Sequence, residues 1–297
     1  MRWQGRRESS NIEDRRSETP GLVRQTGFRG VGVGLIGRGG LKGVVVLVIL
    51  YIGLSFFGYD PSRFLFGDGA LETKSQPEAV SKTPAETTER DRFIATVLAE
   101  TEDTWTTIFH KIGRSYRPPV LVRFRGSIQS KCGFADAATG PFYCPGDQKL
   151  YLDDRFFDQL SQDFGAPGEF AQAYVIAHEV GHHVQTLLGT LGTVNAQRQR
   201  SDNVTANALS VRIELQADCY AGIWAHYTDE KGILDAGDID AALNAANKIG
   251  DDVLQKRMRG FVVPDSFTHG SAKQRVSWFQ MGLTEGTLER CDTFKER

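Results

Sequence analysis

The chain has 297 residues, of which 40% are hydrophobic and 24% are charged, with 35 Lys and Arg against 37 Asp and Glu. This composition excludes a disordered or fibrous protein, and the length allows one large globular domain or two smaller ones. The charge is uneven, because residues 1–42 hold nine Lys or Arg and four Asp or Glu, which leaves 26 against 33, a net of −7, for the rest. Nucleic-acid binding needs a basic surface, so this acidic remainder argues against a nucleic-acid partner.

An apolar run follows the basic N-terminal segment. Residues 41–59 (LKGVVVLVILYIGLSFFGY) contain one charge, Lys42, at the start of the run, where its side chain can reach the membrane interface. This pattern predicts a single transmembrane helix. The basic stretch before it is too long for a cleavable signal peptide, and no small-x-small cleavage site follows closely, so we expect a retained membrane anchor.

The distribution of charge predicts the orientation of this anchor. Lys and Arg are more frequent on the cytoplasmic side of a span, so residues 1–40 are expected to form a basic cytoplasmic segment. The chain after Tyr59 is then expected to face outward, so that the protein crosses the membrane once. Residues 60–88 are rich in Pro, Ser, Thr and Glu, which predicts a flexible linker. Residues 89–297 are expected to form the folded domain.

The cysteines agree with an oxidising compartment, since all four follow the apolar run. Cys132 and Cys144 bracket a turn-rich loop and could form one disulfide, which would leave Cys219 to pair with Cys291 near the C-terminus. The alternatives are four reduced, buried thiols or a zinc cluster. No C-x-x-C spacing in the sequence supports the cluster.

The folded domain is expected to be α+β, rich in helices and with a small antiparallel sheet. Apolar residues recur at helical spacing from Ile94 to Ile112, and a Pro-Pro pair then leads into an alternating strand at residues 120–126. Short strands are expected on both sides of Pro145. Further helices are expected at residues 167–188, 202–227, 238–257 and 272–281.

The first of these further helices contains AHEVGHHVQ, in which polar residues interrupt an apolar pattern. His178 and His182 are four residues apart and lie on one helix face, where two imidazoles can bind one metal ion. Glu179 lies about 100° around the helix, where it can take a proton from metal-bound water. Zn²⁺ suits two imidazoles and one oxygen ligand, and a site with three protein ligands leaves a position for water.

A second pair of polar residues predicts the third ligand. Glu214 and Asp218 are four residues apart in the apolar segment RIELQADCYAGIWA. Two like charges at this spacing repel each other, and a cation between them removes the repulsion. We therefore expect Glu214 to bind the zinc and Asp218 to accept the free ring N–H of His178. The alternative is that both carboxylates lie on a solvated helix face.

These residues resemble those of a known family. His178-Glu179-x-x-His182 followed by Glu214-x-x-x-Asp218 resembles the gluzincin type of zinc peptidase. With the segments GPFYCPGDQKLYLD, ELQADCYAGIWA and the late THG…R…WF, the chain is similar over nearly its whole length to the bacterial membrane-anchored neutral zinc metallopeptidases. The resemblance implies a zincin-like fold, one Zn²⁺ per chain, and hydrolysis of a peptide or protein substrate by zinc-bound water that Glu179 activates. It also implies a single-pass protein of the bacterial inner membrane, with a cytoplasmic N-terminus and a periplasmic catalytic domain.

Peptide hydrolysis also needs a group that stabilises the negative oxygen of the tetrahedral intermediate. The segment SFTHGSAKQRVSWF offers His269 and Arg275, whose spacing is similar to that of a His and an Arg in gluzincins that process CAAX proteins. The alternative is a helix-capping histidine and a surface arginine. His183 points away from the paired ligands and is expected to be packed, and His110 and His226 are expected to be structural.

In zincins an edge strand above the active-site helix binds an extended peptide, and here we expect that strand within residues 148–153 or at Tyr143 beside it. Gly181, between the two histidine ligands, would let a neighbouring backbone approach the metal. A second hypothesis is a non-catalytic, zinc-stabilised extracytoplasmic binding module, closed by a fourth ligand such as His183. Glu179 has no use in such a site, which favours the enzyme.

Overall fold

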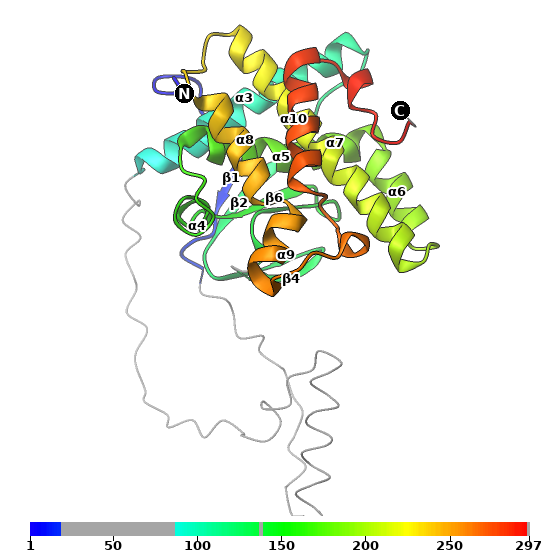
Figure 1. The fold of residues 1–297 in the computed structure, drawn as a ribbon. Helices are drawn as coiled ribbons and strands as arrows, with labels where there is room; N and C mark the ends of the chain where they lie inside the picture. Colours follow the sequence, from blue (N-terminus) through cyan, green and yellow to red (C-terminus); the bar gives the residue numbers. More distant parts are fainter. Residues whose placement is uncertain (19–86, 137–138, 296–297) are drawn as a thin grey trace, which may run out of the picture. The chain divides into compact units, whose positions relative to one another are not determined.

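A four-stranded sheet, a hairpin and a set of helices make up the part of the chain that the computed structural model describes, which is residues 1–18, 87–136 and 139–295 (Figure 1). The strands are β1 (Ile12–Asp14), β2 (Val120–Phe124), β3 (Ser127–Ser130), β4 (Gly133–Asp136), β5 (Phe142–Cys144) and β6 (Lys149–Asp153). The helices are α3 (Glu89–Lys111), α4 (Phe156–Gln162), α5 (Glu169–Leu188), α6 (Thr190–Arg198), α7 (Asn203–Glu230), α8 (Asp238–Lys248), α9 (Asp251–Arg259), η2 (Pro264–Ser266), α10 (Ala272–Glu285) and η3 (Leu288–Cys291).

The sheet has the strand order β1-β2-β6-β5 and is mixed. β1 and β6 run parallel to β2 on its two sides, and only β5 pairs antiparallel, with β6. The antiparallel pair expected around Pro145 is present as β5 and β6. The expectation of an antiparallel sheet is wrong only for the pairs β1-β2 and β2-β6, because alternation of apolar residues sets which face of a strand is buried but not how its neighbour runs. β3 and β4 form a separate antiparallel hairpin. The prediction of a helix-rich α+β fold with small sheets is confirmed.

Local sequence signals set the helix ends. α7 begins after Asp202, whose side chain accepts a backbone N–H at 2.9 Å, and α5 ends at Gly189, which has a left-handed backbone with φ of 89°. The single helix expected over residues 238–257 is divided into α8 and α9 at Gly250. A Cβ atom there would lie 2.3 Å from the backbone nitrogen of Ala272, so the chain needs glycine at this point.

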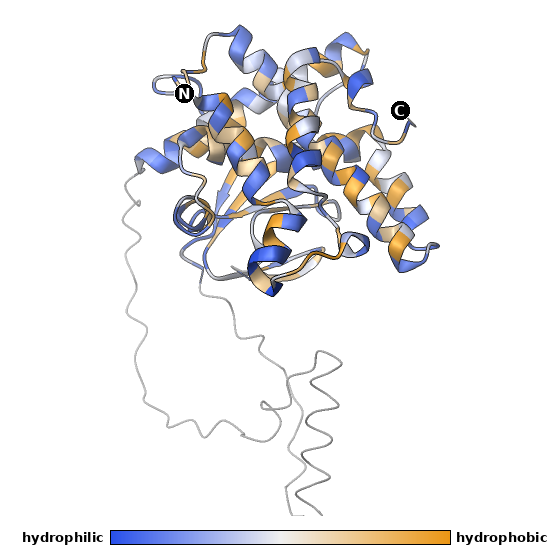
Figure 2. Ribbon diagram, viewed as in Figure 1, coloured by the Kyte–Doolittle hydropathy of each residue, from blue (hydrophilic) through white to orange (hydrophobic). Residues whose placement is uncertain are grey.

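The core depends on close contact between α7 and α10. A Cβ atom on Gly282 of α10 would lie 1.9 Å from the carbonyl oxygen of Cys219, so the two backbones meet where no side chain separates them. Trp224 of α7 and Phe279 of α10 are fully buried next to this contact. Figure 2 shows that α6 and α9, at the edge of the helical layer, carry both hydrophilic and hydrophobic faces, as amphipathic helices do at the boundary of a core.

Both expected disulfides are present. Cys132 pairs with Cys144, and Cys219 of α7 pairs with Cys291 of η3. The alternatives of reduced thiols and of a zinc cluster are therefore excluded for these four cysteines. The second bond attaches the end of the chain to the helix that carries both expected carboxylates.

The N-terminal residues belong to this fold. Trp3 is 4% exposed and packs edge-on against Phe93 of α3, with ring centroids 5.6 Å apart. Arg7 donates a hydrogen bond to the carboxylate of Glu102 at 2.9 Å, and β1 pairs with β2. The charge of residues 1–40 predicts a separate cytoplasmic segment, but Arg6, Arg7 and Arg16 donate to carboxylates of the folded domain, those of Glu100, Glu102 and Asp91 on α3.

The pairing of β1 with β2 limits how the chain can meet a membrane. Arg16 Nη1 lies 3.0 Å from a carboxylate oxygen of Asp91, which brings together the two ends of the stretch between residues 19 and 86. A single crossing within that stretch would leave β1 and β2 on opposite sides of the membrane, so a cytoplasmic N-terminus does not agree with a periplasmic domain in this fold. The predicted span itself, residues 41–59, lies outside the described residues. Among the residues that are described, no helix has the length and hydropathy of a membrane span.

We expect a tag at the N-terminus and a tag at the C-terminus of the full-length protein to be exposed on the same side of the bacterial membrane, because β1 must reach β2. Protease digestion of the two tags in intact and in permeabilised spheroplasts measures this. A known cytoplasmic and a known periplasmic protein are the controls. Digestion of only one tag in intact spheroplasts would show that β1 does not pair with β2 in the cell.

Candidate metal centre

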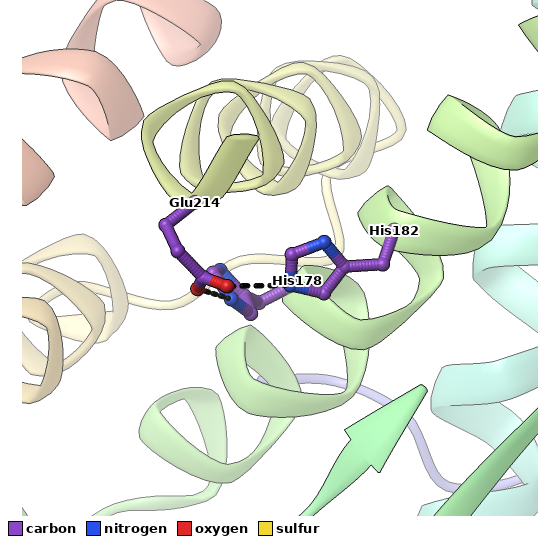
Figure 3. Close-up of side chains that lie close together, drawn as sticks. All are labelled: His178, His182 and Glu214. Carbon is purple, nitrogen blue, oxygen red and sulfur yellow. Dashed lines mark hydrogen bonds and ion pairs between the residues drawn. The ribbon is translucent and has the colours of Figure 1, made fainter. Parts of the chain in front are cut away.

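Helix α5 places the imidazoles of His178 and His182 side by side, with ring centroids 4.9 Å apart. Glu214 of α7 points its carboxylate between them, as Figure 3 shows. Its Oε2 atom lies 3.2 Å from His178 Nε2, and its Oε1 atom lies 3.5 Å from His182 Nε2. One possible ligand atom from each of the three residues lies within 4.8 Å of the other two. The structure therefore brings together the three residues that the sequence predicted as ligands.

The other nitrogen of each ring is fixed by a buried acceptor. His178 Nδ1 lies 2.8 Å from Asp218 Oδ1, and His182 Nδ1 lies 2.9 Å from Gln185 Oε1. Each Nδ1 therefore carries a proton, which leaves the lone pair of Nε2 directed at the shared point. Asp218 lies where the sequence predicted it. Gln185 was missed, although it follows His182 by three residues and so lies on the same face of α5.

The electrostatics of this point favour a cation. Burial alone would lower the pKa of His178, but the charge of Asp218 and hydrogen bonds to Asp218 and Glu214 raise it to about 10. Burial alone would raise the pKa of Glu214, but the nearby imidazoles, His182 first, hold it well below its usual range. Two imidazole nitrogens and one carboxylate oxygen beside an open cleft form the donor set of a catalytic zinc site, so the residues present fit Zn²⁺.

Asp218 is completely buried and is paired with a cation. Arg275 donates to it from Nε at 2.8 Å and from Nη2 at 3.0 Å, and the hydroxyl of Tyr174 donates to it at 2.5 Å. Burial would raise the pKa of Asp218, but the charges of Arg275 and His178 lower it to about 2. The carboxylate is thus held ionised, in one orientation, against the ring N–H of His178.

Arg275 borders the cleft, but its guanidinium is engaged by buried partners. The sequence predicts that it stabilises an oxyanion, but the residue is only 3% exposed. Four of its N–H groups donate to Asp218, to the hydroxyl of Tyr174 and to the carbonyl of Ile249. This geometry assigns Arg275 to positioning Asp218 and, through it, His178. Tyr174 was missed by the sequence analysis, although it precedes His178 by four residues on the same helix face.

Glu179 lies in the wall of the cleft beside the paired imidazoles and is half-buried. Burial raises the pKa of its carboxyl group, and the charges of His182 and His178 oppose that rise. A carboxylate with a raised pKa is a more effective proton acceptor near neutral pH than an exposed one.

His269 faces the same cleft from the loop before α10. Asp251 holds this loop, because its Oδ2 atom accepts the backbone N–H groups of Thr268, His269 and Gly270 at 2.7, 2.6 and 3.0 Å. Its Oδ1 atom lies 3.3 Å from His269 Nδ1. The hydrogen bond to Asp251 raises the pKa of His269, and the charge of Glu214 adds to this against the effect of burial. Asp251 was missed because it lies 18 residues from its partner.

His183 ties α5 to its surroundings, as expected for a packed histidine. Its Nε2 atom lies 2.7 Å from the carbonyl oxygen of Arg117, and its Nδ1 atom lies 3.2 Å from the hydroxyl of Tyr143. Burial lowers the pKa of His183 to about 4, so the ring stays neutral. Within residues 1–18, 87–136 and 139–295, the cluster with metal-ligand spacing holds three residues and does not include this histidine.

A cleft of about 630 Å³ lies over the metal-binding residues, and β5 forms part of its wall through Phe142 and Tyr143. β6 is paired on both sides, by β2 and by β5, so it has no free edge to offer a peptide. The prediction that residues 148–153 bind the substrate is therefore wrong. The alternative, Tyr143, belongs to β5, which lies at the edge of the sheet. In the described part of the chain, β5 is the outer strand of the sheet on this side.

The distance between α5 and α7 is set at Gly181. A Cβ atom on this residue would lie 3.0 Å from the carbonyl oxygen of Ala217 and 3.1 Å from its Cα atom. Because Glu214 and Asp218 flank Ala217 on α7, this close approach also fixes both carboxylates relative to His178. The glycine lets the neighbouring helix approach the metal-binding residues, as the sequence predicted.

Comparison with known proteins identifies the family to which the chain belongs. Residues 1–294 match the family described as "Putative neutral zinc metallopeptidase". The chain is 45% identical over 295 residues to "Uncharacterized protein YpfJ" of Escherichia coli strain K12, which covers 99% of both chains. It is 40% identical over 215 residues to "Uncharacterized protein Rv2575" of Mycobacterium tuberculosis, which covers 69% of this chain and 72% of that protein. No solved structure matches the chain.

We expect Gly181→Ala to weaken zinc binding by about 10- to 100-fold, the range found when the groups that support metal ligands are disturbed. The added methyl group would push α7 away from α5 and move Glu214 from the two imidazoles. Competition with a chromophoric chelator measures the affinity. Gly192→Ala in α6 is the matched control, since a Cβ atom there meets nothing within 4 Å. Equal affinities for the two variants would contradict the role of this helix contact.

We expect Arg275→Met to lower the free energy of unfolding by about 3–5 kcal/mol, because it leaves Asp218 as a buried charge without its partner. The zinc affinity should fall with it, since Asp218 holds the ring of His178. Urea unfolding and chelator competition measure the two effects. Arg212→Met, at an exposed arginine of α7, is the control. If Arg275 acted on the substrate alone, both quantities would stay unchanged.

Proposed function

We propose, because this chain belongs to the neutral zinc metallopeptidase family, that it is a zinc-dependent peptidase that hydrolyses peptide bonds. The observation that carries the proposal is the position of Glu179, half-buried in an open cleft beside two imidazoles and a carboxylate that share one point. A metal site that only stabilises a fold has no use for a further carboxylate at its open side.

One Zn²⁺ per chain would be held by His178, His182 and Glu214. When bound, it supplies a Lewis acid that polarises the peptide carbonyl and lowers the pKa of water to about 7. The protein keeps both Nε2 atoms available, since Asp218 and Gln185 accept the protons on the Nδ1 atoms. The preformed arrangement of these ligands reduces the ordering that metal binding requires.

The remaining chemistry is the transfer of a proton and the stabilisation of a negative charge. The raised pKa of Glu179 lets its carboxylate accept a proton from the attacking water and later donate it to the leaving amine. His269 lies in the wall of the same cleft with a raised pKa, so its ring can donate a hydrogen bond to the carbonyl oxygen as charge develops there. Asp251 orients His269 for this purpose.

The substrate is a peptide or an extended segment of a protein. An extended chain can pair with the outer edge of β5, where backbone hydrogen bonds give affinity without reading each side chain. Phe142 and Tyr143 of that strand line the cleft, so a paired chain would pass over His178 and His182. This placement would bring a backbone carbonyl to the metal.

A non-catalytic, zinc-stabilised binding module is the second candidate. A closed structural site has four protein ligands. His183, the suggested fourth ligand, is engaged at both ring nitrogens by Tyr143 and by the carbonyl of Arg117. Among the described residues the cluster around His178 remains one of three, which favours the enzyme.

We further propose that the protein works at the bacterial inner membrane, on its outer side. The apolar run at residues 41–59 supports membrane attachment, and the disulfides Cys132–Cys144 and Cys219–Cys291 favour an oxidising compartment. Since β1 pairs with β2, residues 1–16 would lie on the same side as the peptidase domain. The net charge gives no reason to expect a nucleic-acid partner.

We expect Glu179→Gln to keep one zinc per chain and to lower the rate of peptide hydrolysis by about 10²- to 10⁴-fold, the usual contribution of a general base. His182→Ala should lose both zinc and activity. Digestion of casein by the full-length protein, with and without a chelator, measures the rate, and elemental analysis measures the zinc. Full activity in Glu179→Gln, or activity that survives removal of the zinc, would contradict the mechanism.

A further inference from the structure

The cleft over the metal-binding residues differs in character between its two ends. The end near the start of α5 is lined by large apolar side chains, Phe142, Phe156, Phe164 and Leu254. The end near α6 includes polar side chains, Asn195, Arg198 and Ser210. Figure 1 shows α4 and α6 on opposite sides of α5, in agreement with their connections to its two ends. Leu191 of α6 also lines the second end, so a peptide that crosses the metal site meets large aromatic rings at one end and a mixed apolar and polar surface at the other.

The aromatic rings at the apolar end are held in place by the protein. The rings of Phe156 and Phe164 lie 6.4 Å apart between centroids, tilted by 41°. The guanidinium of Arg257 lies 5.7 Å from the centroid of the Phe164 ring and donates to the carbonyl of Asp163. A Cβ atom on Gly140 would lie 3.7 Å from the Phe156 ring, so that ring is also covered by backbone. Both rings are half-buried, and their remaining surface lines the cleft.

Phe142 contributes a third ring from β5. It stacks on Tyr151 of β6 with centroids 4.8 Å apart and an interplanar angle of 8°, so one face is covered by the sheet. Leu254 of α9 approaches the same end of the cleft from a separate element. Four apolar side chains from three regions of the chain thus converge without filling the space between them.

No charged side chain of the described residues lines this end of the cleft. In the described part of the chain, the charged or titratable side chains that line the cleft belong to the metal centre and its surroundings or, in the case of Arg198, to the α6 end. The charged group next to this end is the guanidinium of Arg257, which lies over the Phe164 ring and donates to the carbonyl of Asp163. An acidic or basic side chain among the rings themselves would lose water without a charged partner in the cleft wall. A large apolar side chain would instead remove apolar surface from water on both sides of the contact.

We propose that this apolar end is the pocket that sets specificity, and that the enzyme cleaves peptide bonds next to a large apolar residue such as Leu, Phe or Met. The proposal rests on the peptidase activity proposed above. Because the rings are already fixed, binding orders few protein side chains. The gain comes from the size of the substrate side chain, so small residues such as Gly and Ala are poor substrates at this position.

A peptide library digested by the zinc-loaded, full-length protein tests the specificity. We expect cut sites with Leu, Phe or Met on one side of the bond, and a kcat/KM for Phe at least about 10-fold above that for Ala, since each methylene in an apolar pocket contributes about 10-fold or more. Phe156→Ala and Leu254→Arg should reduce this preference. Phe134→Ala is the matched control, because Phe134 lies outside the cleft on β4 and is 68% exposed.

A binding measurement separates the pocket from the chemistry. Phenylalanine hydroxamate and glycine hydroxamate carry the same metal-binding group, so calorimetry with the zinc-loaded protein compares their side chains alone. We expect the phenylalanine compound to bind at least about 10-fold more tightly. Leu254→Arg should reduce the difference while the zinc content stays at one per chain, and Phe134→Ala should keep it.

The outcomes are distinct. Cleavage without a side-chain preference, or equal affinities for the two hydroxamates, overturns the pocket and leaves the peptidase activity. Tighter binding of phenylalanine hydroxamate in a protein that cuts no peptide overturns the activity and leaves the pocket. A preference that persists unchanged in both Phe156→Ala and Leu254→Arg places the specificity elsewhere and overturns the assignment to these residues.

Discussion

The buried pair of Asp218 and Arg275 is the interaction on which the metal centre depends. Asp218 comes from α7 and Arg275 from α10, and the same carboxylate accepts the ring N–H of His178 from α5. A buried ion pair is costly to form, because both charges lose water, and its value lies in the orientation that it enforces. The close contact of α7 with α10 at Gly282 is what allows the arginine to reach the carboxylate. One ion pair thereby connects three helices to one metal ligand.

The second histidine has its own path of support. The side chain of Gln185 accepts from His182 and donates to the carbonyl of Ile213 at 2.7 Å and to Gln216 at 3.1 Å. Gln216 in turn donates to the carbonyl of Cys291 at 3.0 Å. The disulfide with Cys219 joins Cys291 to α7, so η3 is part of the structure that holds His182. The two imidazoles are thus fixed by separate networks, one through Arg275 of α10 and the other through the carbonyl of Cys291 in η3.

The sequence predicted the parts of this site that depend on helical periodicity. His178 and His182 share a face of α5 whatever the angle at which α5 crosses its neighbours. Glu214 and Asp218 could be predicted because two acidic side chains on an apolar helix face need a partner. The role of Arg275 could not be found, since it depends on where α10 crosses α7. The role of Asp251 could not be predicted either, because it accepts three backbone N–H groups, and no pattern of residue types in the sequence indicates such contacts. The membership of β1 in the sheet was also hidden, because three residues paired with a strand more than a hundred positions away leave no local pattern.

The charges around the metal-binding point do not balance among the side chains alone. Glu179, Glu214 and Asp218 bring three negative charges against the single positive charge of Arg275, a net of −2. The raised pKa values of His178 and His182 express this excess, since each ring would gain stability by holding a second proton. Their Nδ1 atoms are already engaged, so that proton would sit on the Nε2 atoms that face Glu214, where a divalent cation can replace it and cancel the excess. With those charges matched, the developing charge on a substrate oxygen becomes the unbalanced one in the cleft, and the ring of His269 lies in the wall of that cleft.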